Sequence, residues 1–495
     1  MALTSRRRFL EQSALTAAAM YGHPLKAPAY TRSIFRAHEQ TAIPLDPAVI
    51  RKLASEITGH VITPEASDYE SSRLVENRAY DRHPALIVRC AGASDVARAL
   101  EFGQKQNLPL AARAGGHNAA GYGVCNGGLV IDLSGMKRVE IDAQQHLGRA
   151  EGGVLVGELD EATQRFGLAT PVGTCPTVGI GGLTLGGGEG ALMPKYGATC
   201  DNLVSARVVT VDGRQVEASQ NCNPDLFWAI RGGGGNFGVV TTFEYQLHPV
   251  TDVLAGALIY PAGRIPELLQ AYVKFTAAAP DEMSAAGLIL PSEQGPRFQM
   301  LVGYCGQPTV GSDLLRPLRL PLKPQVDTVR ATTYLEAQRS WFPAVAAKPS
   351  GYFVANAFLP EVSEAVIATI AAATRDAPRR FMVLIGNFRG AVTRVPLTHM
   401  AFAMRQPGYE IDVSGNWSSR DEKDSAVRWA NALCDKLKPL AHGLYINALS
   451  ETSEQLVTAA YGSNYARLME IKKKYDPQNV LRLNPNIRPS MISHN

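Results

Sequence analysis

Two glycine-rich segments of the chain carry side chains that could react with a bound cofactor. The first runs Arg113-Ala114-Gly115-Gly116-His117-Asn118 and reaches Gly121, and the second, residues 173–190, has eight glycines in eighteen positions and contains Cys175. Glycine loses much conformational freedom on folding, so this density indicates a backbone that approaches a ligand closely, as around a phosphate chain. His117 could point at that ligand, or it could be a turn residue whose ring is satisfied locally.

Neither segment fits the common nucleotide loops. Residues 173–190 lack the Gly-Lys-Ser/Thr ending of a P-loop, and they contain no Gly-x-Gly-x-x-Gly. That pattern occurs at 233–238, after an expected helix (225–231) and before an expected strand (239–245). A dinucleotide fingerprint needs the strand first. We therefore exclude a nicotinamide-binding fold.

A strand expected at 409–417 places two carboxyl groups on one face. Because side chains alternate along a strand, Glu410, Asp412 and Ser414 share one side. Tyr409, Ile411 and Val413 then share the other. If helices cover the apolar side, the polar side is free to line a cavity. For Glu410 the alternative is a solvated surface position.

The elements that position these groups form two patterns. A strand (84–90), a helix (94–107) and a strand (109–113) form a β-α-β unit that leads into the His117 loop. From residue 251 longer helices alternate with strands, which predicts an α+β domain with a sheet covered by helices on one side. The expected helices are 266–279, 362–375 and 423–437, and the expected strands are 285–290, 298–304, 352–358, 381–388 and 409–417.

Five segments, in order along the chain, resemble berberine bridge enzyme-like oxidases of the vanillyl-alcohol oxidase superfamily. They are 113–117, Cys175-Pro176-Thr177-Val178-Gly179 with its glycine run, 195–202, 225–238 and 474–486. The resemblance implies a two-domain FAD-binding fold of the vanillyl-alcohol oxidase type. It implies an FAD-binding domain at 40–250, a substrate domain with an antiparallel sheet at 251–445, and a C-terminal segment, 446–495, that returns to the first domain.

The resemblance implies FAD bonded through its 8α-methyl group to His117 and through C6 to Cys175. For Cys175 the alternatives are a buried thiol or a disulfide with Cys125, Cys200 or Cys222. Val178 occupies a gate position where valine admits O2. The implied FAD-contacting residues are Arg113, Ala114, Gly115, Gly116, His117, Asn118, Gly121, Cys175, Val178, Gly179, Gly181, Gly182, Leu185, Gly186, Gly190, Asp201, Asn202, Gly238, Val239, Val240, Asn484 and Asn486.

The implied reaction removes hydride from an alcohol, sugar or secondary-metabolite carbon and reduces O2 to H2O2. In the family, a carboxylate at the position of Asp412 is the base or assists it, and Glu410 and Tyr445 are further catalytic candidates. Ala448 stands where the family often has a tyrosine base, and Leu183 where many relatives have histidine. The alternatives are a flavin dehydrogenase with another acceptor and a flavin-binding protein with little turnover.

The net charge limits the possible partners, and the N-terminal segment predicts where the protein is located. The 495 residues carry a net charge of +4 and no long basic block after the first ten residues, so we expect no nucleic-acid partner. We also expect no metal. Residues 1–30 resemble a twin-arginine signal peptide, with Ser5-Arg6-Arg7-Arg8-Phe9-Leu10 before an Ala-rich run. This predicts export by the twin-arginine machinery to the periplasm or the medium.

Overall fold

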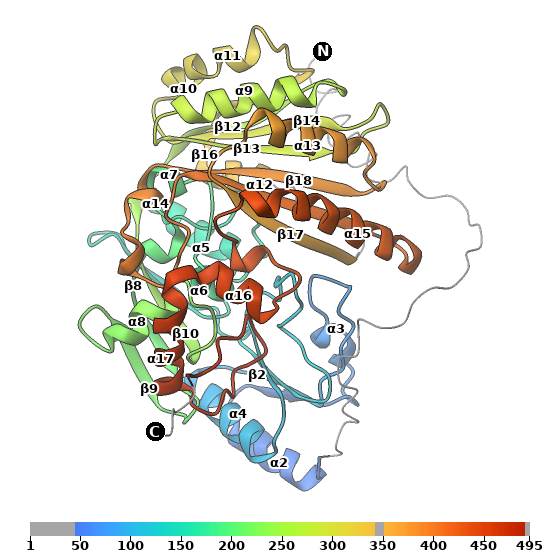
Figure 1. The fold of residues 1–495 in the computed structure, drawn as a ribbon. Helices are drawn as coiled ribbons and strands as arrows, with labels where there is room; N and C mark the ends of the chain where they lie inside the picture. The colour runs from blue at the N-terminus through green and yellow to red at the C-terminus, as the bar shows by residue number, and fades with distance from the viewer. Residues whose placement is uncertain (1–44, 342–350, 491–495) are drawn as a thin grey trace, which may run out of the picture.

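The computed structural model describes residues 45–341 and 351–490. The predicted signal peptide lies outside these ranges. Figure 1 shows a helix-backed sheet in the upper part of the molecule and two smaller sheets with many loops below it. The predicted domain limits near residues 250 and 445 fall in short connections, between β11 (His248–Pro249) and β12 (Asp252–Ile259) and just before a 3-10 turn at Ile446–Ala448.

The β-α-β unit is present at the base of the molecule. Its sheet has the order β1-β2-β4-β3, and β2 and β3 both run parallel to β4. Leu86, Ile87 and Val88 are fully buried, because a parallel strand covered on both faces needs apolar side chains throughout. The elements are α2 (Pro47–Glu56), β1 (His60–Ile62), β2 (Leu86–Arg89), α4 (Ala93–Lys105), β3 (Leu110–Arg113) and β4 (Leu129–Asp132).

A second sheet, antiparallel, has the order β5-β6-β10-β8-β9. Residues of the C-terminal segment, among them Val457, Leu468 and Ile487, share one hydrophobic core with this sheet. The elements of this region are β5 (Val139–Asp142), β6 (Leu147–Glu151), α5 (Val156–Gln164), α6 (Ile180–Leu185), β8 (Leu203–Val209), β9 (Gln215–Ser219), α8 (Pro224–Ile230), β10 (Val239–Gln246), α16 (Glu454–Tyr461) and α17 (Tyr465–Tyr475).

The upper sheet is antiparallel and confirms the α+β fold predicted from the sequence. Its order is β15-β12-β14-β13-β18-β19-β17, and β16 also pairs with β12. All five predicted strands and all three predicted helices are present. They are α9 (Ile265–Ala278), β13 (Met283–Leu290), β14 (Arg297–Tyr304), β17 (Gly351–Leu359), α13 (Glu364–Arg375), β18 (Phe381–Phe388), β19 (Gly408–Trp417) and α15 (Arg420–Leu437). The added strands are β12, β15 (Val326–Asp327) and β16 (Arg330–Thr333).

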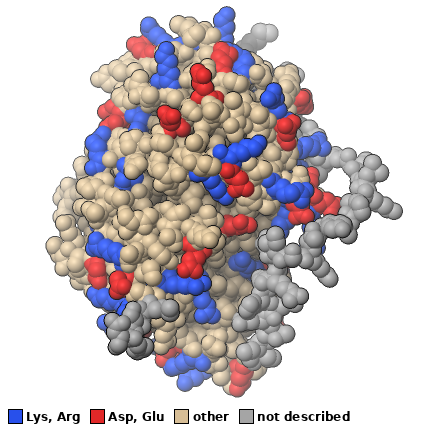
Figure 2. All heavy atoms as spheres, viewed as in Figure 1, with Lys and Arg blue, Asp and Glu red and all other residues tan. Residues whose placement is uncertain are grey.

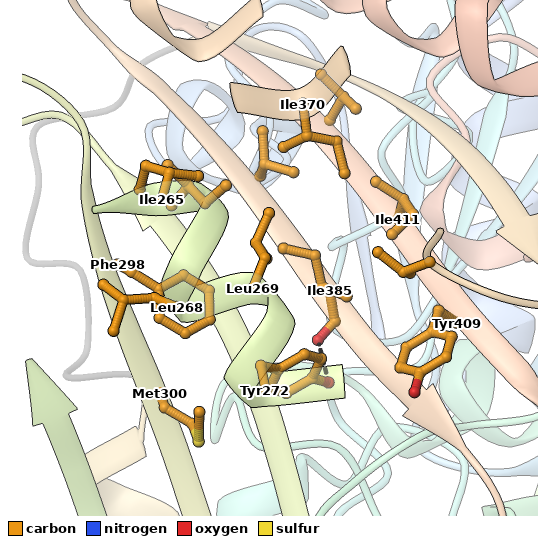
Figure 3. Close-up of a cluster of buried hydrophobic side chains, with 14 of the residues drawn as sticks. Ile265, Leu268, Leu269, Tyr272, Phe298, Met300, Ile370, Ile385, Tyr409 and Ile411 are labelled. Atoms are coloured by element: carbon orange, nitrogen blue, oxygen red, sulfur yellow. Dashed lines mark hydrogen bonds between the residues drawn. The ribbon is translucent and has the colours of Figure 1, made fainter. Parts of the chain in front are cut away.

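Helices α9, α13 and α15 cover one face of this sheet. Ile370 on α13 and Ile385 and Ile411 on the strands are fully buried there. Tyr272 on α9 points into the same core, and its hydroxyl donates a 2.8 Å hydrogen bond to the Ile385 carbonyl (Figure 3). The apolar half of the predicted alternation in β19 therefore faces the helices.

The remaining α-helices and strands are shorter. They are α3 (Tyr69–Arg73), β7 (Leu168–Ala169), α7 (Met193–Tyr196), β11, α10 (Pro308–Leu314), α11 (Arg316–Arg319), α12 (Tyr334–Trp341) and α14 (Ala391–Arg394). No helix within 45–341 and 351–490 is long and apolar enough to cross a membrane. On the face shown in Figure 2, acidic and basic side chains are interspersed, in keeping with the small net charge.

Candidate functional site

The two glycine-rich segments pack against each other. A Cβ on Gly115 would lie 2.3 Å from the Gly179 nitrogen, and one on Gly179 would lie 2.8 Å from the Ala114 Cβ. Side chains at these positions would force the loops apart. Gly116 and Gly121 also have φ of +71° and +68°, which favours glycine. The structure therefore brings the first loop and the second into one site.

Other glycines that were predicted to contact FAD lie directly against neighbouring atoms of the chain. A Cβ on Gly181 would lie 3.2 Å from the Gly152 carbonyl oxygen, and one on Gly190 would lie 1.8 Å from the Val172 carbonyl oxygen. At Gly186 it would overlap the Asn447 amide. The glycine run is thus packed on several sides by the chain itself.

Beside the packed loops the backbone borders open space. A Cβ on Gly182 or Gly235 would meet no atom within 4 Å. The Asn484 amide donates to the Gly235 carbonyl at 3.2 Å, and the Oδ1 atoms of Asn484 and Asn486 are buried without a partner among the described residues. Buried acceptors of this kind normally have a donor. Open backbone and unmet acceptors fit a cofactor such as FAD held between these loops and the C-terminal segment.

Three predicted residues lie at the strand that follows the 232–238 loop. Gly238 has φ of +156°, and Val239 and Val240 begin β10 with 3% exposure each. The Leu185 carbonyl oxygen accepts from the Gly232 and Gly234 nitrogens at 3.1 and 2.8 Å. These bonds tie the end of the second loop to the 232–238 loop, so both belong to the same site.

His117 and Cys175 lie on the two packed loops. Burial lowers the pKa of His117, and the negative charge of Glu76 opposes that shift. Cys175 is partly exposed, with its sulfur 3.4 Å from the Thr177 Oγ1. All seven cysteines lie in the described ranges and are free, so the disulfide alternative for Cys175 is wrong. The carbonyl oxygen of Val178, three residues on, accepts a hydrogen bond from Val156 N at 2.9 Å.

Four of the predicted cofactor residues have partners within the chain. Arg113 forms a buried ion pair with Asp132 at 3.0 Å, and Asn118 Oδ1 accepts from Ala120 N and Tyr122 N at 3.0 and 3.2 Å. Asp201 accepts two bonds from the Arg405 guanidinium, at 2.9 and 2.7 Å. Asn202 Oδ1 lies 2.7 Å from His248 Nε2. These contacts hold the loops in shape, and their contact with FAD stays a prediction.

The two predicted carboxyl groups share one amide. Asn356 on β17 donates to Glu410 at 2.8 Å and to Asp412 at 2.6 Å, and its Oδ1 accepts from Tyr445 N at 2.9 Å. Glu410 is only 1% exposed, so the alternative of a solvated surface position is wrong. Asp412 is partly exposed, so it is the more accessible member of the pair.

A third carboxyl group, Glu189, joins this pair from the end of the glycine run. Burial raises its pKa to about 8, and burial also raises the pKa of Glu410 and of Asp412 well above the usual range. The mutual repulsion of the neighbouring carboxylates adds to the shift. No ion pair joins any of the three to a Lys, Arg or His in the described part of the chain. We call Glu189, Glu410 and Asp412 the carboxyl cluster.

Tyr445 connects the cluster to the glycine run. Its hydroxyl oxygen accepts from Gly188 N at 3.1 Å and from Asn447 Nδ2 at 3.2 Å. Burial raises the pKa of Tyr445 well above its usual range, so the hydroxyl keeps its proton. Ala448 and Leu183 pack against hydrophobic clusters, as their side chains require. Tyr445 therefore lies between the glycine run and the carboxyl groups.

Sequence reasoning missed Glu189, Asn356, Glu76 and Tyr352. Glu189 could have been found from the sequence, because a single carboxylate within a run of glycines is not needed there for solubility. Asn356 lies on a strand that was predicted correctly, but its contacts with β19 depend on the strand order. Glu76 and Tyr352 meet across 276 positions of sequence, which no local pattern reveals.

Comparison with known sequences agrees with this geometry. Residues 84–219 match the FAD binding domain family, and residues 444–488 match the family described as berberine and berberine like. An FAD-linked oxidoreductase of Bacillus subtilis, YgaK, is 31% identical over 88% of this chain and 98% of its own length. The (R)-6-hydroxynicotine oxidase of Paenarthrobacter nicotinovorans is 30% identical, over 88% of this chain and 99% of its own.

Solved structures show the same fold. The 6-hydroxy-D-nicotine oxidase of Arthrobacter nicotinovorans superimposes with a TM-score of 0.79 at 28% identity, covering 88% of this chain and 98% of that one. A xylooligosaccharide oxidase from Myceliophthora thermophila gives a TM-score of 0.80 at 23% identity, covering 90% of this chain and all of that one. The second likeness concerns the fold alone.

Proposed function

Because this chain belongs to the berberine bridge enzyme-like family of FAD-linked oxidoreductases, we propose that it is an oxidase with covalently held FAD. The flavin is bonded to His117 and to Cys175. The enzyme removes hydride from an alcohol, sugar or secondary-metabolite carbon of a small molecule and passes the electrons to O2, giving H2O2.

The observation that carries the proposal is the packing of the His117 loop against the Cys175 loop. Thr177 and Gly179, two and four residues after the cysteine, lie against Gly115, two residues before the histidine. An imidazole and a free thiol thus come from two loops that are in direct contact. If the His117 ring were hydrogen-bonded only within its own turn, the Cys175 loop would not need to pack against the His117 loop.

The bound FAD would supply the hydride acceptor and the route of electrons to O2. The chain's own residues would accept and hold the proton, at the carboxyl cluster. Asp412 Oδ accepts the proton from the substrate O–H or N–H group as its carbon is oxidised, and Asn356 fixes the orientation of that carboxylate. Glu410 and Glu189 lie behind it, so the proton can be shared within the carboxyl cluster.

The substrate class follows from the face that surrounds Asp412. On β17 and β18 the cross-strand neighbours of Glu410 and Asp412 are Phe358, Asn356, Gly386 and Leu384, which are apolar or small except for Asn356. Such a wall accepts a small ring whose one polar group points at the carboxylate. Among the relatives, one is named as an oxidase of 6-hydroxynicotine, which is a small ring compound, and another as an oxidase of xylooligosaccharides.

The mass of the denatured protein tests the flavin bonds. We expect one added FAD in the wild type, in His117→Ala and in Cys175→Ala, and none in the double variant. Complete release of FAD from the wild type on acid denaturation would contradict the covalent proposal. Reduction of the flavin by sugars, phenolic alcohols and cyclic amines, followed optically, then identifies the substrate, and a flavin that none of them reduces would favour a binding protein.

Reoxidation in air tests the oxidase assignment. The proposed gate residue Val178 predicts rapid reoxidation after photoreduction, and Val178→Leu slows it. Slow reoxidation of the wild type would point to a dehydrogenase with another acceptor.

We further propose export by the twin-arginine route, supported by the Ser5–Leu10 motif. Cell fractionation of the wild type and of Arg6→Lys/Arg7→Lys checks this, and an unchanged distribution of the variant would contradict it.

A further inference from the structure

The segment Glu76-Asn77 joins the His117 loop to the upper sheet. Glu76 N donates to the Gly116 carbonyl at 3.1 Å, one residue before His117. Asn77 is fully buried; its Nδ2 donates to the Ala119 carbonyl at 2.9 Å and to the Tyr352 carbonyl at 3.0 Å. Tyr352 N in turn donates to Asn77 Oδ1 at 3.2 Å. Both ends of the loop that carries His117 are therefore fixed relative to β17.

The same segment sets a carboxylate beside the imidazole. The Tyr352 hydroxyl donates to Glu76 Oε2 at 2.7 Å, so the acid is held from the substrate-domain side. The negative charge of Glu76 acts on His117, and burial together with Glu76 raises the pKa of Tyr352 well above its usual range, with a small further contribution from the nearby Cys175. Glu76 and Tyr352 thus lie near both residues that would bind the flavin, while neither has been given a role by the reaction described above.

We propose that Glu76, held by Tyr352, is a positioning residue for the bond between His117 and the flavin. Among the described residues its carboxylate accepts a side-chain hydrogen bond from Tyr352, and in the flavin-loaded protein it also takes the ring N–H of His117. This fixes the tautomer in which the other nitrogen has a free lone pair. The inference rests on the covalent attachment at His117 proposed above.

The chemistry of attachment balances with O2 as oxidant. One C–H bond of the flavin 8α-methyl group and one N–H bond of the imidazole break, and one C–N bond forms. The two electrons and two protons released leave on O2 as H2O2. Glu76 is placed to take the imidazole proton, which otherwise would have to leave a half-buried ring without an acceptor.

The test uses the Cys175→Ala background, in which only His117 can hold FAD. The full chain is purified with Cys175→Ala alone and with Glu76→Gln, Glu76→Asp, Tyr352→Phe or Glu70→Gln added. The covalent fraction is read from the mass of the acid-denatured protein during incubation with FAD in air. Total FAD is read from the absorbance before denaturation, so that loss of binding and loss of bonding are separated.

We expect Glu76→Gln to slow bond formation about tenfold or more while FAD still binds, in the range found for partners that orient a histidine. Tyr352→Phe gives a smaller slowing, and Glu76→Asp restores part of the rate. Glu70, an exposed carboxylate on α3, is the matched control and leaves the rate unchanged. An unaltered rate in Glu76→Gln, or equal loss of bound and bonded FAD, overturns the inference. No covalent FAD in Cys175→Ala itself would instead refute the attachment at His117.

Discussion

Two groups of buried charges in this molecule are built in opposite ways. Lys472 and Asp476 are both fully buried and 2.7 Å apart, and the Lys472 ammonium also donates to the carbonyls of Asn236 and Leu481. Asp476 accepts from Val480 N and Leu481 N at 2.8 and 2.9 Å. Every charge there has a counter-charge and hydrogen bonds. Burial is therefore compatible with a fixed structure.

The carboxyl cluster has no such compensation. Two of the three acids, Glu410 and Asp412, share the single amide of Asn356, and Glu189 Oε1 is buried without a hydrogen-bond partner among the described residues. No Lys, Arg or His is paired with any of the three in the described chain. Since buried like charges cannot all ionise, the cluster must hold protons. The Lys472–Asp476 pair therefore anchors the C-terminal segment to the 232–238 loop, whereas the carboxyl cluster is kept at least partly protonated.

Removing the accessible acid should give the largest effect. We expect Asp412→Asn to lower the rate of flavin reduction by substrate by about 10²- to 10⁴-fold, because general-base catalysis contributes that much. Stopped-flow absorbance measures it, at unchanged FAD content. Ser414→Ala, two residues along the same face of β19, is the control and keeps the rate. If Asp412→Asn reduced its flavin at the wild-type rate, Asp412 would not be the base.

Breaking the compensated pair should affect stability. Lys472→Ala leaves Asp476 as an uncompensated buried charge, so we expect the free energy of unfolding to fall by about 3–5 kcal/mol. Urea unfolding followed by tryptophan fluorescence measures this loss. Lys473→Ala, at the next position of α17 and partly exposed, should change it little. Equal midpoints for the two variants would mean that the buried pair is not an anchor.

Neutralising one member of the cluster should stabilise the protein in a pH-dependent way. Glu189 has a pKa of about 8 in the folded chain against 4.5 as its ordinary value. The free energy that protonated Glu189 adds to stability is therefore fully present below pH 4.5 and is lost as the pH rises toward 8. We expect Glu189→Gln to gain stability over the wild type between pH 5 and pH 8, by about 1 kcal/mol or more. Melting temperatures at both pH values check this; a constant difference contradicts the assigned shift.

We expect the smallest effect from breaking an exposed ion pair. Lys438 and Asp435 lie 2.7 Å apart with side chains 47% and 62% exposed. Water screens such a pair, so Asp435→Asn should alter the free energy of unfolding by no more than about 0.5 kcal/mol. A loss as large as that of Lys472→Ala would show that burial is not what separates the two groups of charges.

Much of the upper domain could be predicted because its signals are local. The alternation in 409–417 gave both the strand and its two faces, and the structure places Ile411 in the core and Glu410 opposite to it. The short strands β15 and β16 were missed, since two to four residues carry too little periodicity. Glu410 was left open between a cavity and a solvated surface, because alternation tells which side chains share a face and not what covers that face.

The sequence by itself determined the position of the two glycine-rich loops, the order of the main helices and strands, and the placing of Glu410 and Asp412 on one face. Each depends on glycine density, on the period of a strand or helix, or on motifs within a few residues. Only the tertiary structure decided that Glu189 meets Glu410, that Arg405 neutralises Asp201, and that Tyr352 holds Glu76. These groups are 204 to 276 positions apart or lie on different elements. Their contacts arise from how the sheets and loops pack, which spacing along the chain does not encode.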